Sequence, residues 1–156
     1  VDVGAMLSRL PAPLLEVHVA PGTRVAADAA LLAAALLNLL DNAQRHGARR
    51  AWVEPCGAGG LRVRDDGPGV DAAQRRRLQA ALDGQDYENA VGLGLMMADR
   101  VARAHAGRMR LPESGEGFAV ELDLGPVPAF RATPGAVSAG TPPGSAPGAP
   151  CGRDSA

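Results

Sequence analysis

Two asparagines placed one helical turn apart are the residues of this sequence best suited to chemistry. Asn38 and Asn42 interrupt an apolar run that extends from Leu36 to Ala43, and Arg45 follows one turn later. Residues at i, i+4 and i+7 share one face of a helix. Because a buried amide without a partner costs about 1–3 kcal/mol, this stripe needs polar partners. A metal ion and phosphate groups would supply them, and Mg²⁺ needs only one or two protein ligands when phosphates provide the rest.

A glycine turn follows a strand-like segment at Asp65-Asp-Gly-Pro-Gly69, and Val70 comes next. Gly67 and Gly69 let the backbone approach a flat ligand closely and adopt positive φ angles. The carboxylate of Asp65, at the end of the predicted strand, can accept a hydrogen bond from an exocyclic amine. Such an acceptor favours adenine over guanine.

A third element, from Gly92 to Leu95, reads Gly-Leu-Gly-Leu and opens a second predicted helix. The free N–H groups and the positive end of the dipole at a helix start favour phosphate. Each of the three elements alone is more typical of ordinary turns and helices than of a binding site. Together, in this order, they indicate a nucleotide site.

The segments that must position these residues alternate between helical and strand patterns. Asp28 is a suitable N-cap for the first helix, and Gly47 is suited to end it. This order predicts an α/β fold in which helices cover one face of a mixed sheet. The sequence predicts helices at 29–46, 72–82 and 93–106, and strands at 14–19, 51–54, 61–64, 108–111 and 118–124.

Composition limits the class of protein. The chain has 156 residues, 46% of them hydrophobic, which is enough for one domain with a core. A net charge of -1 predicts no nucleic-acid partner. No apolar stretch reaches the roughly 20 residues of a membrane span, and no signal segment is present, so we expect a cytoplasmic domain. Cys56 and Cys151 are too far apart in sequence to indicate a disulfide framework or a metal cluster.

The pattern of the chain changes near Gly125. Residues 1–125 are predicted to form one domain. After it, Pro, Gly, Ala and Ser dominate, with too few apolar residues to offset the entropy of ordering. Residues 126–156 are therefore predicted to be a disordered tail.

The order of the three elements resembles the N, G1 and G2 boxes of sensor histidine kinases. The matching segments are Leu36 to Gly47, Val63 to Val70 and Gly92 to Leu95, and the resemblance extends over about 1–125. It is a resemblance to the C-terminal ATP-binding catalytic domain, which is related to the ATPase domains of gyrase, heat-shock chaperones and mismatch-repair proteins. It implies a two-layer α/β sandwich with a mixed, mostly antiparallel sheet and helices on one face, the Bergerat-type ATP-binding fold.

The resemblance also implies ATP and Mg²⁺ as ligands. Asn42 would ligate Mg²⁺, and Asn38 and Arg45 would contact phosphates or the metal. Asp65 would bind the adenine amine. His46 either touches a phosphate or satisfies the last carbonyl groups of its helix. The other nucleotide-binding candidates are Gly67, Gly69, Val70, Gly92, Leu93, Gly94 and Leu95, with Gly92 and Gly94 expected to anchor the lid over the nucleotide.

Several residues depart from the family pattern. Kinases of this family often carry a Phe-x-Pro-Phe motif after the G1 box, where this chain has the segment from Leu78 to Leu82, and the lid is short. Related hydrolases place a glutamate one turn before the first asparagine, where this chain has Ala34 and Ala35. Neither can take a proton from water. This absence suits a kinase and also fits a degenerate domain.

The expected function is therefore that of the catalytic domain of an ATP-dependent protein-histidine kinase. It would donate the γ-phosphoryl group to a histidine on a separate dimerisation domain, from which the phosphate would pass to a response regulator. None of His18, His46 and His105 is followed by an acidic residue, so the phosphoacceptor is expected elsewhere. A degenerate nucleotide-binding module and a stand-alone ATPase remain alternatives. We expect the isolated domain to be a monomer and the full-length protein to be a homodimer, with the inner (plasma) membrane as an expected location.

Overall fold

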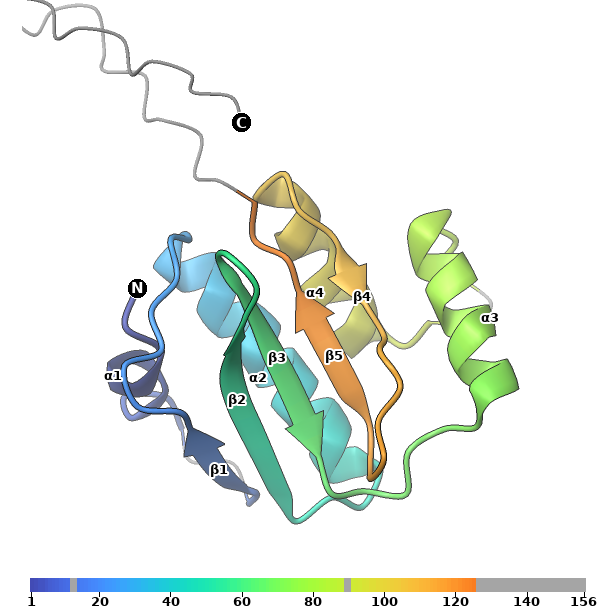
Figure 1. Ribbon diagram of the computed structural model, residues 1–156, viewed down its shortest axis with the longest axis horizontal. Helices are drawn as coiled ribbons and strands as arrows, with labels where there is room; N and C mark the ends of the chain where they lie inside the picture. The colour runs from blue at the N-terminus through green and yellow to red at the C-terminus, as the bar shows by residue number, and fades with distance from the viewer. Residues whose placement is uncertain (12–13, 89–90, 126–156) are drawn as a thin grey trace, which may run out of the picture.

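A computed structural model describes residues 1–11, 14–88 and 91–125 (Figure 1). Its elements follow the chain in the order α1 (Val3–Leu7), β1 (Glu16–Val19), α2 (Ala29–Arg45), β2 (Arg50–Cys56), β3 (Gly60–Asp65), α3 (Ala72–Asp83), α4 (Leu93–Ala104), β4 (Met109–Arg110) and β5 (Ala119–Leu122). The predicted tail, 126–156, lies outside the described residues.

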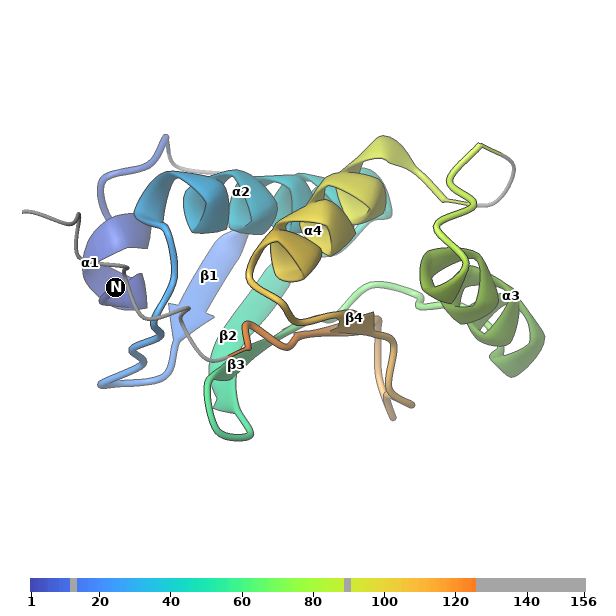
Figure 2. The same cartoon turned by 90° about the horizontal axis from the view of Figure 1, so that it is seen from above.

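The five strands form one mixed sheet in the order β1-β2-β3-β5-β4. β1 and β2 are parallel, joined through α2, and the other three pairs are antiparallel. Figure 2 shows α2 and α4 over one face of this sheet. The predicted two-layer sandwich with a mostly antiparallel sheet and helices on one face is therefore confirmed.

α2 has both an N-cap residue at its start and apolar residues at helical spacing along its length. Asp28 Oδ1 accepts a hydrogen bond from the Leu31 N–H at 2.9 Å, which satisfies one free donor of the first turn. Its buried residues are spaced by three and four along the helix, so they form one apolar face. They are Leu32, Ala35, Leu36, Leu39, Leu40 and Ala43.

α4 packs against α2 on the same face of the sheet. Its buried residues are Leu95, Ala98, Asp99, Val101 and Ala102. His105, the C-cap of α4, joins the end of α4 to the start of α2. It is 8% exposed, its Nε2 accepts a hydrogen bond from the Asp28 N–H at 2.9 Å, and its Nδ1 lies 2.8 Å from the Val101 carbonyl oxygen.

α3 and α1 lie outside this two-helix layer. α3 stands beside the sheet (Figures 1 and 2), and Leu82 is its buried residue. α1 was not predicted from the sequence. It is held by the Asp2 carboxylate, which accepts from the Ala5 N–H, and by the fully buried Val3.

The predicted segment boundaries are close to the observed ones. The last two strands are shorter than predicted, and β2 continues to Cys56, two residues beyond the predicted end. Cys56 is a free thiol, while Cys151 lies outside the described residues. Within the described ranges, no helix combines the length and apolar character needed to cross a membrane.

Candidate functional site

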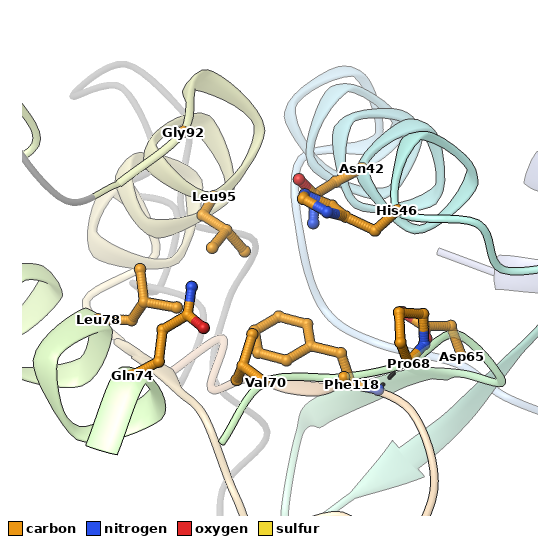
Figure 3. Close-up of a pocket in the computed structure, with 11 residues that line it drawn as sticks. Asn42, His46, Asp65, Pro68, Val70, Gln74, Leu78, Gly92, Leu95 and Phe118 are labelled. Atoms are coloured by element: carbon orange, nitrogen blue, oxygen red, sulfur yellow. Dashed lines mark hydrogen bonds between the residues drawn. The ribbon is translucent and has the colours of Figure 1, made fainter. Parts of the chain in front are cut away.

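A cavity of about 280 Å³ opens between α2, α3, α4 and the glycine turn that follows β3. In Figure 3, Asn42 and His46 reach it from α2, Leu95 from α4, and Gln74 and Leu78 from α3. Its lining residues are Asn42, His46, Asp65, Pro68, Gly69, Val70, Gln74, Leu78, Gly92, Leu95 and Phe118. The lining is mainly apolar with a few polar groups, which is the usual character of a small-molecule site.

Asp65 is the most firmly oriented polar group of the cavity. It is 8% exposed at the end of β3. Its Oδ1 accepts hydrogen bonds from the N–H of Gly67 at 2.8 Å and from the N–H of Phe118 at 3.2 Å. Two donors on Oδ1 fix the carboxyl plane, and the described hydrogen bonds leave Oδ2 free to accept another donor.

Glycines make this arrangement possible. Gly69 and Gly117 have φ angles of 67° and 66°. A Cβ on Gly69 would overlap the backbone of Gly117, and a Cβ on Gly117 would overlap the backbone of Asp65. Only glycine combines this backbone conformation with such close approach. The glycine turn thus lies tightly against the segment before β5, with the Asp65 carboxylate between them.

α2 supplies the polar wall that faces Asp65. Asn42 is half-buried and lines the cavity, and His46, the C-cap of α2, lies one turn further. Asn38 lies on the same stripe but outside the cavity lining, and its Nδ2 donates to the Ala34 carbonyl at 2.8 Å. Arg45 pairs with Asp41 at 3.0 Å, with its side chain 77% exposed.

The first turn of α4 forms another edge of the cavity. Gly92 is the N-cap and makes no side-chain capping bond, so side chains leave the first N–H groups of the helix free. Gly92 and Leu95 line the cavity, while Leu93 is 69% exposed. Gly94 lies on the α2 side, where it packs against Asn38 and Asn42.

The structure thus gathers Asn42, His46, Asp65, Gly69, Val70, Gly92 and Leu95 from the sequence-predicted set around one cavity. It leaves Asn38, Arg45, Gly67, Leu93 and Gly94 outside the lining, with Gly67 and Gly94 in supporting contacts. Four lining residues were not predicted: Pro68, Gln74, Leu78 and Phe118. Of these, Pro68 could have been inferred from its place inside the glycine turn, whereas the others depend on how distant segments pack.

No group of three or more His, Cys, Asp or Glu side chains suited to a metal ion occurs in the described part of the chain. The oxygen donor that α2 presents to the cavity is the single Asn42 amide. One such oxygen suits Mg²⁺ only when phosphate oxygens and water complete its coordination.

Residues 27–126 match the sequence model of a family described as histidine kinase-, DNA gyrase B-, and HSP90-like ATPase. Among curated proteins, the signal transduction histidine-protein kinase/phosphatase MprB of Mycobacterium sp. (strain KMS) is 32% identical over 152 residues, covering 77% of this chain and 28% of that protein. Sensor protein CutS of Streptomyces coelicolor is 37% identical over 121 residues, covering 66% and 29%. The chain therefore spans less than a third of the length of these two relatives.

Solved structures give the same grouping. The ATP binding domain of PrrB from Mycobacterium tuberculosis aligns with a TM-score of 0.62 at 26% identity, covering 81% of this chain and 96% of that one. The histidine kinase domain of the Escherichia coli osmosensor EnvZ aligns with a TM-score of 0.54 at 26% identity, covering 88% and 90%. Both likenesses extend over most of the neighbouring domain.

Proposed function

Because the chain belongs to the family of histidine kinase-, DNA gyrase B- and HSP90-like ATPases, with sensor histidine kinases as relatives, we propose that it binds MgATP and donates the γ-phosphoryl group to a histidine on a separate dimerisation domain. The observation that carries this proposal is a single cavity with Asn42 on one side and the fixed carboxylate of Asp65 on the other. A volume of about 280 Å³ is near the low end of ligand pockets, about 300–1,000 Å³, so the base would be enclosed and the phosphates would extend to the mouth.

In this proposal Asp65 selects the base. Its Oδ1 is occupied by two backbone donors, so Oδ2 is available to accept the exocyclic amine of adenine. Guanine presents a carbonyl oxygen at that place, which would face a carboxylate oxygen. Val70, Leu78 and Phe118 would cover the base with apolar surface.

The phosphates would lie between α2 and the start of α4. Asn42 would ligate Mg²⁺, and the free N–H groups after Gly92 would bind phosphate oxygens. We keep Asn38 as a second metal or phosphate contact because it shares the stripe of Asn42. Arg45 would have to leave Asp41 to reach a phosphate, and His46 is already at the cavity. Bound Mg²⁺ would neutralise phosphate charge.

The residues before the stripe favour transfer over hydrolysis. Ala35 is fully buried, and the Ala34 carbonyl is occupied by the Asn38 amide. Neither residue can take a proton from water. An imidazole acceptor needs no such base, because phosphoryl transfer relies mainly on positioning and charge neutralisation.

The partners follow from this function and are part of the proposal. They are the phosphoacceptor domain of the same longer protein and a response regulator, and the longer protein would be a homodimer. The domain described here would lie in the cytoplasm, with the whole protein in the inner membrane.

Thermal unfolding with and without MgATP tests nucleotide binding. ATP at 100 times its dissociation constant should add about 2.7 kcal/mol to the free energy of unfolding. Asp65→Asn should abolish most of this gain, because its NH₂ group would face the adenine amine. Asp66→Asn is the matched control. Asp66 holds the N–H groups of Arg49 and Arg50 but does not line the cavity. Equal gains in both variants would contradict the assignment.

Phosphoryl transfer is tested separately with labelled ATP and the phosphoacceptor domain of the longer protein. Label on the acceptor histidine is the expected result. Binding without transfer would instead favour a regulatory nucleotide-binding module. Steady phosphate release by the isolated domain would favour a stand-alone ATPase.

A further inference from the structure

α3 supplies one wall of the cavity but has little apolar attachment to the rest of the domain. Gln74 and Leu78 line the cavity, yet Leu82 is the only residue of the helix that is buried. Figure 2 shows α3 beside the sheet, away from the layer formed by α2 and α4. Leu78 also packs, half-buried, against the core. Polar contacts therefore add to these two apolar ones in positioning the wall.

One set of polar contacts joins the end of α3 to α4 through a buried carboxylate. Asp99 Oδ2 accepts hydrogen bonds from the Tyr87 hydroxyl at 2.6 Å and from Arg103 Nε at 2.8 Å. Arg103 Nη2 donates to the Leu82 carbonyl at 2.7 Å. The Arg100 guanidinium lies 5.7 Å from the centre of the Tyr87 ring. Tyr87, Asp99 and Arg103, here called the Asp99 cluster, thus tie both the last turn of α3 and the segment after it to α4.

A second tether holds the middle of α3. Gln79 Oε1 accepts a hydrogen bond from the Leu111 N–H at 2.7 Å, and its Nε2 donates to the Met109 carbonyl at 3.3 Å. These bonds fasten α3 to the segment around β4. The first half of the helix is held by Arg75, whose Nη2 donates to Glu113 Oε1 at 2.9 Å. The Asp99 cluster is the contact that fixes the last turn.

The burial of Asp99 is not explained by stability alone. Its side chain is 1% exposed, and Oδ1 has no hydrogen-bond partner among the described residues. Burying an acceptor without a partner is unfavourable, and apolar residues in place of a buried ion pair are often equally or more stable. None of the three residues lines the cavity. A hydrogen bond is directional, so it can fix the orientation of the helix it holds, which an apolar contact does less well.

On the basis of the proposed nucleotide binding, we propose that the Asp99 cluster is a positioning device for the nucleotide site. It holds α3 so that Gln74 and Leu78 complete the cavity wall opposite Asn42. Figure 3 shows the Gln74 amide directed toward the interior of the cavity, and the described hydrogen bonds leave this amide free for a ligand. Loss of the cluster would leave the α2 and α4 walls in place, since these two helices pack against each other and α4 also buries Leu95, Ala98, Val101 and Ala102.

The test uses Tyr87→Phe, which removes one hydroxyl and keeps the ring, together with Asp99→Asn and the double variant. Calorimetry with MgATP should give a dissociation constant about two- to tenfold higher for each single variant, the range that corresponds to one lost hydrogen bond. In the double variant the loss of binding free energy should be smaller than the sum of the two single losses, because both changes weaken the same contact between residues 87 and 99. Arg77→Gln is the control, because Arg77 is exposed on α3 and takes part in none of the described ion pairs.

Hydrogen exchange of the nucleotide-free domain supplies a second readout. Exchange of the α3 amides should rise in Tyr87→Phe while that of α2 stays unchanged. Unchanged exchange and an unchanged dissociation constant would overturn the positioning role and leave nucleotide binding intact. Failure of the unaltered domain to bind MgATP would overturn the proposed function, and the positioning role with it.

Discussion

Gly94 packs against the backbone of Asn38 where the first turn of α4 meets α2. A Cβ atom on Gly94 would stand 3.0 Å from the Asn38 carbonyl oxygen and 3.6 Å from the Asn42 Cβ. The first of these distances is shorter than ordinary van der Waals contact. The missing side chain therefore sets how near the start of α4 comes to the asparagine stripe.

Gly94→Ala should weaken MgATP binding more than it weakens the fold. Overpacking costs about 1–3 kcal/mol, and alanine recovers about 1 kcal/mol through its higher helix propensity, so the net loss of stability should be small. The displaced first turn would no longer hold its N–H groups opposite Asn42. Gly115→Ala is the control, since a Cβ there has no neighbour within 4 Å and Gly115 does not line the cavity. Calorimetry giving the same dissociation constant for both variants would contradict this account.

His105→Phe should lower the free energy of unfolding by about 0.5–1.5 kcal/mol, because it removes the partly buried hydrogen bond from the Asp28 N–H to Nε2. The Val101 carbonyl accepts from Nδ1–H, which leaves Nε2 as the acceptor in the neutral ring. Urea unfolding measures the loss. His18→Phe is the control. The His18 side chain is 46% exposed and stacks on Trp52, which phenylalanine can also do, while its 3.0 Å contact with Glu16 lies at the surface. A change within about 0.5 kcal/mol is therefore expected. Equal losses in both variants would count against the bridging role.

The long elements could be predicted from sequence because local signals agree with the packing. The Asp28 cap and the three-and-four spacing from Leu32 to Ala43 place α2 to within one residue of its end. β2 was predicted to stop before Pro55 and instead continues. Its parallel pairing with β1 ends at Val53, so the side of β2 toward β1 is unpaired at Pro55, where no N–H is required.

The parts that could not be predicted depend on contacts between distant segments. α1 has five residues, too few for a periodic pattern, and is held by pairing of Asp2 with Arg24. Phe118 lies at the cavity beside Asp65, which accepts its N–H although it is 53 residues earlier in the chain. Conversely, Arg45 had the right spacing for the stripe, but Asp41 at i,i+4 pairs with it at the surface. Helix spacing alone does not decide whether Arg45 contacts a phosphate or pairs with the Asp41 carboxylate.

Glu121→Gln should remove part of the acid sensitivity of the domain. Arg62 Nε donates to Glu121 Oε1 at 3.0 Å, and this hydrogen bond holds the pKa of Glu121 below its ordinary value of 4.5. A lowered folded-state pKa means that the pair stabilises the domain above the unfolded value and that this contribution disappears as the pH falls through the folded value. The unaltered domain should therefore be more stable than Glu121→Gln at neutral pH, by about 0.2–1 kcal/mol for a partly exposed pair, and equally stable in acid.

Urea unfolding at a series of pH values measures this difference. Glu54→Gln is the control for Glu121→Gln. In the same sheet, Arg64 Nη2 lies 3.5 Å from Glu54 Oε1. Both side chains are 38% exposed, and no hydrogen bond between them is described. A difference that persists unchanged in acid would show that Glu121 acts through packing.

Tyr87 should titrate above the ordinary tyrosine value in the folded domain. Burial is the main cause of its raised pKa, and the hydrogen bond to the Asp99 carboxylate adds to it. Because the folded state holds the phenolic proton more tightly, Tyr87 contributes stability below the unfolded pKa of 10.0, and this contribution is lost as the pH rises through the folded value. Tyr87 is the single tyrosine of the chain, so phenolate absorbance reports on it alone. Asp99→Asn should move the midpoint down without reaching the urea-unfolded value, since the ring stays buried. A midpoint equal to that of the unfolded chain would show that Tyr87 is not held against Asp99 in solution.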